Sequence, residues 1–336
     1  LAGDGAPAHE EVARLGRLAD AAETRRSPML YAVVQLATLW DFHLVWLLER
    51  WKARAGTRLR GWLAALGEVE ALAAFGTLAH ENPGWAVPEL VTAPARLEAE
   101  ALGHPLLAPD AVVPNDVALG PPGRFLLVTG SNMAGKSTLV RAIGLNVVLA
   151  QAGAPVCARR LRCPPLAPAT SMRVHDSLER GVSFFMAELE RLKVVVDAAR
   201  AAQRDGRRTT LFLLDEMLQG TNSAERTIAA RAILAQLLAT GAVGAVTTHD
   251  LALAAAPDGN AAGDAAVVWR AAEPVHFAEQ VTEQAGRMAM TFDYRMRAGV
   301  ATSTNALKLL RLVGLDGDVA PRRPAVPPFL PPEYRA

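Results

Sequence analysis

Cysteine and lysine are scarce in this chain, and each scarcity narrows the possible functions. Two cysteines, Cys157 and Cys163, are too few for a disulfide framework or a four-cysteine zinc site, and we expect both to be unpaired. The net charge of +1 gives no overall attraction to nucleic acid, so DNA contact would need a local patch or a part outside this chain. Lysine occurs only four times, at positions 52, 136, 193 and 308.

Long hydrophobic runs are also few. The most apolar stretch, "MLYAVVQLATLWDFHLVWLL", is long enough to span a bilayer, but it contains Asp41, which would be costly there. Trp40, Leu44, Leu47 and Trp51 recur at helical spacing, which predicts a buried amphipathic helix and no membrane span. No signal peptide is recognisable, so we expect a cytoplasmic protein.

The 336 residues suffice for one large domain or two smaller ones. Residues 1–90 predict a helical domain, with two helices over 28–80 that break at 53–58 and end at Asn82. From 124 to about 250, short apolar runs alternate with helical patterns, and strand-like runs recur over 265–297. This alternation predicts an α/β fold with a parallel-sheet core over 91–318, and the glycine-rich loop "GSNMAGKS" at 130–137 within it predicts a P-loop NTPase domain. A proline-rich tail follows over 319–336.

One of the rare lysines lies in "TGSNMAGKST", directly after the strand-like run "FLLV". Gly130, Gly135, Lys136 and Ser137 match the spacing G-x-x-x-x-G-K-[ST] between a strand and a helix. The glycines allow backbone N–H groups and the helix dipole to face phosphate oxygens. Lys136 would contact the β- and γ-phosphates, and Ser137 would bind Mg²⁺.

A second polar cluster follows the predicted strand "TTLFLLD". Asp215 and Glu216 come where this strand ends, so that both can approach the phosphates. Asp215 would hold Mg²⁺ through water, and Glu216 would act as the catalytic base on the attacking water. His249 ends the next strand and could sense the γ-phosphate.

The residues around this loop resemble the ATPase domain of the MutS DNA mismatch-repair family. The resemblance rests on "TGSNMAGKST", "RVHDSLERGVSFFMAELERL", "LLDEMLQGTNSAER", "TTHD" and "MTFDYRMRAGVATSTNALKLLRLVGL". It covers about 100–315 and, more weakly, the helices of 28–90. It implies an ABC-type ATPase that works as a homodimer with ATP and Mg²⁺ between subunits, and a DNA partner.

The resemblance also implies a set of site residues. Ser183 would reach the partner's γ-phosphate, Asn115 would lie beside the base, and Gly220, Thr221 and Asn222 would lie at the dimer seam. Val112 occupies the family's usual aromatic position under the adenine, so we expect aliphatic contact there. The nucleotide-binding residues expected in the loop are Gly130, Ser131, Asn132, Met133, Ala134, Gly135, Lys136, Ser137 and Thr138.

Other functions stay open at this point. The chain contains no contiguous serine-glycine-glycine signature of transporter ATPases and no long heptad helices of chromosome-organising relatives. A clamp that binds ATP to lock a dimer and barely hydrolyses it is a third possibility. The mismatch-reading domain has no counterpart in this sequence, so we expect a short MutS-related protein. "ARRLR" at 158–162 and Arg204, Arg207 and Arg208 are interpreted as solvated surface rather than a DNA patch.

Overall fold

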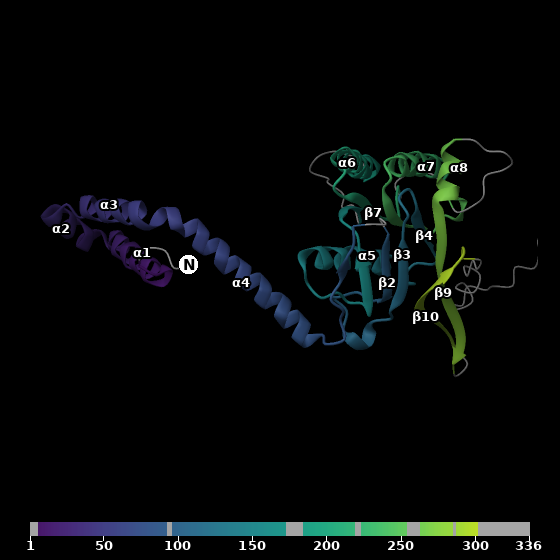
Figure 1. Cartoon of the computed structure of the whole chain (residues 1–336), viewed down its shortest axis with the longest axis horizontal. Helices are drawn as coiled ribbons and strands as arrows, with labels where there is room; N and C mark the ends of the chain where they lie inside the picture. The colour runs from purple at the N-terminus through teal and green to yellow at the C-terminus, as the bar shows by residue number, and fades with distance from the viewer. Residues whose placement is uncertain are drawn as a thin grey trace, which may run out of the picture. The chain divides into compact units, whose positions relative to one another are not determined.

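The computed structural model describes residues 6–92, 96–172, 184–218, 223–253, 263–284 and 287–301. Contacts divide the chain into two units, Leu1–Glu81 and Asn82–Ala336 (Figure 1). The predicted tail over 319–336 lies outside the described residues.

The first unit is helical. It contains α1 (Ala8–Ala22), η1 (Glu23–Arg26), α2 (Pro28–Thr38), α3 (Trp40–Trp51), η2 (Lys52–Gly56) and α4 (Thr57–Glu81). α2 ends because Leu39 adopts a left-handed conformation with φ of 51°. Glu11 of α1 is 1% exposed and pairs with Arg54 of η2 at 3.0 Å, and it also accepts through its carbonyl from the Trp51 indole. The buried carboxylate is therefore satisfied and fixes α1 against the η2 segment.

The structure corrects one prediction for this unit. The expected break at 53–58 is wrong, because η2 is a π-helical segment through which the helix continues. The expected apolar face is buried in part: Leu44 and Trp51 are buried and Trp40 is half-buried, whereas Leu47 is 39% exposed. Other apolar side chains are far more exposed, among them Leu36 at 86% and Phe42 at 73%. By length and composition, the continuous helix Trp40–Glu81 could cross a membrane, since one 18-residue window has a mean hydropathy of 1.3 and no buried residue.

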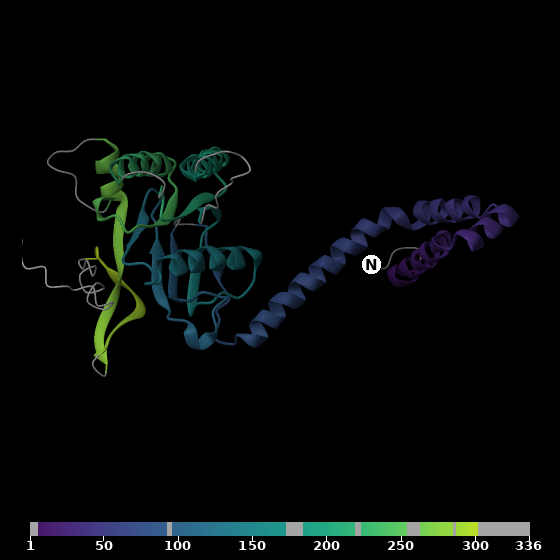
Figure 2. The ribbon, with the colours of Figure 1, turned by 180° about the vertical axis from the view of Figure 1, so that it is seen from behind.

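The second unit is built on a six-stranded sheet with the order β10-β9-β4-β8-β7-β6. β4 pairs in parallel with both β8 and β9, and β7 pairs in parallel with β8 and β6. Among the described strands of this sheet, β10 alone runs antiparallel, along β9 at the sheet edge (Figure 2). The strands are β4 (Phe125–Thr129), β6 (Leu166–Ser171), β7 (Thr209–Asp215), β8 (Val243–Thr247), β9 (Ala272–Gln284) and β10 (Arg287–Ala298).

A second, four-stranded sheet has the order β1-β5-β2-β3. Its strands are β1 (Glu89–Leu90), β2 (Leu97–Leu102), β3 (Asn115–Leu119) and β5 (Arg160–Cys163). Helix α5 (Lys136–Ala152) shares one hydrophobic cluster with both sheets, through Ile143 and Val147 on the helix and Leu119 on β3. Both elements that flank the glycine-rich loop, β4 and α5, are therefore anchored in the same buried cluster.

Three helices cover the other face of the large sheet: α6 (Phe184–Asp205), α7 (Ser223–Ala239) and α8 (Asp264–Ala271) (Figures 1 and 2). Phe125 and Leu127 of β4 pack in a hydrophobic cluster with residues of α6, α7 and α8, whereas Leu126 and Val128 pack in the cluster that contains α5. Both faces of β4 are thus buried, which is why its sequence is continuously apolar. The predicted α/β fold with parallel strands is confirmed, and the strand-like runs expected within 265–297 form β9 and β10, which follow α8.

Candidate nucleotide-binding site

The glycine-rich loop connects β4 to α5 and depends on two positive φ angles. Gly130 has φ of 137° and Gly135 has φ of 106°. A Cβ at Gly130 would lie 2.7 Å from the carbonyl oxygen of Phe277 on β9. Any other residue at 130 would therefore combine backbone strain with a clash against the neighbouring strand.

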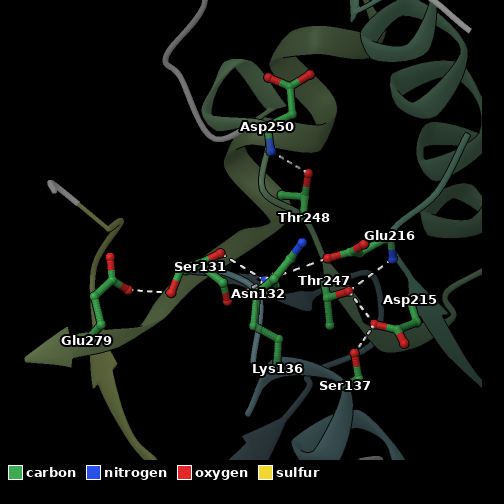
Figure 3. A network of polar contacts seen from close by, with 11 residues as sticks. Ser131, Asn132, Lys136, Ser137, Asp215, Glu216, Thr247, Thr248, Asp250 and Glu279 are labelled. Carbon is green, nitrogen blue, oxygen red and sulfur yellow. Dashed lines mark hydrogen bonds and ion pairs between the residues drawn. The ribbon is translucent and has the colours of Figure 1, made fainter. Parts of the chain in front are cut away.

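Lys136 begins α5 and is 3% exposed. Its Nζ donates to the carbonyl oxygens of Gly130 and Ser131, both at 2.8 Å (Figure 3). Glu216 Oε1 lies 3.6 Å from the same nitrogen. Burial lowers the pKa of Lys136, and the nearby carboxylates, led by Glu216, act in the opposite direction. The ammonium thus folds back onto its own loop.

Ser137 and Asp215 lie in direct contact although 78 positions separate them in sequence. The Ser137 hydroxyl donates to Asp215 Oδ1 at 2.8 Å, and Thr247 Oγ1 donates to the same oxygen at 2.6 Å (Figure 3). A hydroxyl and a carboxylate are hard oxygen ligands of the kind that Mg²⁺ prefers. The described residues contain no group of three or more His, Cys, Asp or Glu side chains that could hold a metal, so water and phosphate would complete its coordination.

Glu216 directly follows β7 in a strained conformation. Its φ is 52° and that of Leu218 is 62°, both unusual for residues other than glycine. The Glu216 N–H donates to Thr247 Oγ1 at 2.9 Å, and the Leu218 N–H donates to the Glu188 carboxylate of α6. These bonds hold the turn that brings the Glu216 carboxylate to Lys136.

His249 is less clearly connected to this cluster. It is exposed, between Thr248 and Asp250 just after β8. Asp250 accepts from Thr227 Oγ1 at 3.1 Å and lies 3.3 Å from Arg226 Nη2, so α7 anchors the segment that carries His249. Among the described residues, His249 itself makes no hydrogen bond or ion pair with Lys136, Asp215 or Glu216.

A cavity of about 490 Å³ adjoins the start of α5. Its walls include the predicted residues Val112, Asn115, Met133, Gly135 and Thr138, and also residues that the sequence did not indicate. These additional residues are Leu102, Gly103, His104, Leu107, Ala111, Val113, Leu139, Ala142, Phe277 and Tyr294.

Asn115 occupies a structural position at the rim of this cavity. Its Nδ2 donates to the Tyr294 carbonyl at 3.0 Å, and its Oδ1 accepts from the Met296 N–H at 2.6 Å. The amide therefore ties β3 to a bulge of β10, where Tyr294 has φ of 54°. Tyr294 brings an aromatic ring to the cavity that Val112 lines with an aliphatic side chain.

The family model described as MutS domain V matches residues 126–322. The chain belongs to the MutS family. Endonuclease MutS2 of Thermomicrobium roseum is 33% identical over 229 residues, which are 68% of this chain and 26% of that protein. DNA mismatch repair protein MutS 2 of Halobacterium salinarum is 31% identical over 275 residues, 80% of this chain and 29% of that protein.

A plant relative is similar over a comparable stretch. DNA mismatch repair protein MSH6 of Arabidopsis thaliana is 31% identical over 236 residues, 67% of this chain and 17% of that protein. This chain therefore spans less than a third of the length of these MutS relatives. MutS-family proteins are ATPases, and domain V is their ATPase domain.

The MutS resemblance proposed from the sequence is thus confirmed, and several of its site residues lie together. Lys136, Ser137, Asp215 and Glu216 converge, and Ser131 of the same loop donates to Glu279 on β9 (Figure 3). Ser183, Gly220, Thr221 and Asn222 lie outside the described residues. Thr247 was missed, although its place at the end of an apolar strand in "VTTHD" is a signal of the same kind as that of Asp215.

The positive charges of the basic segment "ARRLR", at the start of β5, are paired with carboxylates. Arg159 pairs with Glu100 at 3.4 Å, Arg160 with Glu89 at 3.5 Å, and Arg162 with Glu89 at 3.2 Å and Glu98 at 3.4 Å. Arg207 likewise pairs with Asp205. These ion pairs favour the interpretation of solvated surface over that of a phosphate-binding patch.

Proposed function

We propose that this chain binds ATP with Mg²⁺ at the glycine-rich loop and hydrolyses it. The observation that carries the proposal is the convergence of Lys136, Ser137, Asp215 and Glu216 at the junction of three parallel strands and α5. The cation, the hydroxyl and the two carboxylates have the chemistry needed for phosphoryl transfer to water.

Each residue has a distinct role in this proposal. Lys136 leaves the loop carbonyls and contacts the β- and γ-phosphates. The backbone N–H groups of the loop and the N-terminus of α5 also face these phosphates and bind them. Ser137 and Asp215 hold Mg²⁺, whose chemistry is to neutralise phosphate charge. Glu216 accepts the proton of the attacking water, and His249 contacts the γ-phosphate when nucleotide is bound. The base occupies the cavity lined by Val112 and Tyr294.

Steady-state hydrolysis and binding of ATP by the 336-residue chain test these roles. We expect Lys136→Ala to abolish Mg²⁺-ATP binding, whereas Lys193→Ala, which removes a 74%-exposed lysine of α6, should leave it unchanged. Glu216→Gln should keep ATP binding and lower the turnover by about 100-fold or more, because it removes the general base. Equal turnover in the parent and both site variants would contradict the proposal.

We further propose that two copies of the chain close around ATP and that the resulting dimer binds DNA. The resemblance around Ser183 supports closure, since a serine that precedes a helix can offer its hydroxyl and free N–H groups to an anion. Sedimentation of Glu216→Gln with ATP should detect a dimer that Ser183→Arg abolishes, and a monomer in both would contradict closure. A salt-dependent mobility shift of duplex DNA in the presence of the chain tests whether DNA is a partner. A cytoplasmic location stays a prediction.

A further inference from the structure

The walls of the 490 Å³ cavity are mostly apolar, so few groups can distinguish one base from another. Side chains with hydrogen-bonding groups come from His104, Asn115, Thr138 and Tyr294, and no carboxylate is among the described lining residues. Thr138 belongs to the first turn of α5, beside Ser137, which places it at the phosphate end.

Asn115 is not available to read a base. Its Nδ2 already donates to the carbonyls of Tyr294 and Val113, at 3.0 Å and 3.3 Å, and its Oδ1 accepts from Met296. Rotating the amide toward a ligand would break bonds that hold the β10 bulge against β3. The remaining ring in the cavity with an N–H group is His104.

The backbone that carries His104 is rigidly held. Gly103 donates its N–H to the Cys157 carbonyl at 2.7 Å, and its own carbonyl accepts from the fully buried Asn146 side chain at 2.9 Å. A Cβ at Gly103 would lie 2.6 Å from Val112 Cγ1 and 2.7 Å from Cys157 Sγ. Packing this tight positions the next residue without further ordering when a ligand binds.

A local hydrogen bond fixes which His104 nitrogen carries the proton. Nδ1 accepts from the Leu106 N–H at 3.2 Å, so the neutral ring bears its hydrogen on Nε2. Burial, followed by the charge of Arg141, lowers the pKa of His104 and favours this neutral form. Among the described residues, none forms a hydrogen bond with Nε2.

We propose that His104 determines the base specificity of this site by donating its Nε2–H to N1 of adenine. The inference rests on the proposed function, since it concerns the base of the nucleotide bound at the loop. His104 belongs neither to the glycine-rich loop nor to the strand ends that carry Asp215 and His249, and its N–H group, rather than the Asn115 amide, recognises adenine.

The chemistry of the two purines explains the selectivity. Adenine N1 accepts a hydrogen bond, whereas guanine N1 carries a hydrogen and is a donor. A fixed donor that faces N1 therefore pairs with adenine but meets a second donor in guanine, which leaves both hydrogens unpaired, at a cost that favours ATP.

Two conservative variants separate the two functions of the ring. His104→Asn keeps an acceptor near Nδ1 for the Leu106 N–H and removes the donor at the Nε2 position. His104→Gln places an amide N–H near the Nε2 position and gives up the bond to Leu106. Equilibrium binding of ATP and GTP to the 336-residue chain, with Mg²⁺ present, measures the ratio of their dissociation constants. We expect His104→Asn to lower the preference for ATP by about tenfold and His104→Gln to retain most of it.

Nucleotide analogues test the same contact without any substitution in the protein. 1-Deaza-ATP should bind the parent chain about tenfold more weakly than ATP, 3-deaza- and 7-deaza-ATP should bind like ATP, and His104→Asn should remove the difference for 1-deaza-ATP. The inference is overturned if 1-deaza-ATP binds the parent as tightly as ATP, or if His104→Asn keeps the parent's preference for ATP over GTP.

The Lys136→Ala variant distinguishes this failure from failure of the proposed function. If the parent binds ATP and GTP equally and Lys136→Ala abolishes both, the nucleotide site stands and the role of His104 is refuted. If the parent binds neither nucleotide, both the site and the role of His104 are refuted.

Discussion

Gly130→Ala tests whether the loop depends on its contact with β9. The substitution places a methyl group 2.7 Å from the Phe277 carbonyl oxygen at a φ of 137°, so it adds a backbone clash to conformational strain. Gly153→Ala is the matched control, because Gly153 also has a positive φ, of 85°, but a Cβ there meets nothing within 4 Å. Strain alone costs about 1–3 kcal/mol at either position.

The steric contribution is the difference between the two variants. Forcing the strands or the loop apart to relieve a contact with a main-chain oxygen costs typically about 1–3 kcal/mol beyond the strain. For a unit of this size, an extra 2 kcal/mol corresponds to a melting temperature lower by about 4–8 °C. Thermal unfolding followed by circular dichroism measures it, and ATP binding should be lost in Gly130→Ala and kept in Gly153→Ala. Equal melting temperatures together with equal ATP binding would show that the contact between Gly130 and Phe277 does not shape the loop.

Three further predictions concern residues around the site. Thr247→Val should lower the free energy of unfolding by about 2 kcal/mol, because it removes the hydroxyl that donates to Asp215. Thr247→Ser keeps the hydroxyl and should lower it by only about 1 kcal/mol, for the lost methyl group. Equal losses for the two variants in urea unfolding would contradict a stabilising bond between Thr247 and Asp215. Burial raises the pKa of Asp250, but the hydrogen bonds from Ala252, Thr227 and Arg226 outweigh it and hold the pKa below its usual range. The ionised Asp250 should therefore stabilise the folded state above about pH 4, and this stabilisation should be lost as the pH falls through the lowered pKa. Asp250→Asn should flatten that acid limb of the unfolding curve, and an unchanged limb would exclude Asp250 as its source. Burial raises the pKa of Cys163 to about 11, so a thiol reagent at pH 8 should label this residue only after unfolding, and rapid labelling of the native chain would contradict its burial.

The sequence predicted the second unit well because its signals are local. An apolar strand, a glycine turn and a helix start adjoin one another around Lys136, and each depends on neighbours within about ten residues. The burial of both faces of β4 was likewise readable from "FLLV".

The errors arose where distant contacts decide the outcome. Arg54 of η2, where the helix was expected to break, pairs with Glu11, a partner 43 positions away that no local pattern indicates. The bonds from Asn115 to Tyr294 and Met296 of β10 were likewise not readable from the sequence, because these partners lie 179 and 181 positions away. His104 has no motif of its own and reaches the cavity through the packing of Gly103.

A crystal structure of the chain with a non-hydrolysable ATP analogue and Mg²⁺ would show whether the glycine-rich loop binds the triphosphate. We expect Lys136 Nζ to leave the carbonyl oxygens of Gly130 and Ser131 and to contact the β- and γ-phosphates, with Ser137 and Asp215 at the metal ion. An analogue absent from the loop, with Lys136 still bonded to those two carbonyls at saturating nucleotide, would contradict it.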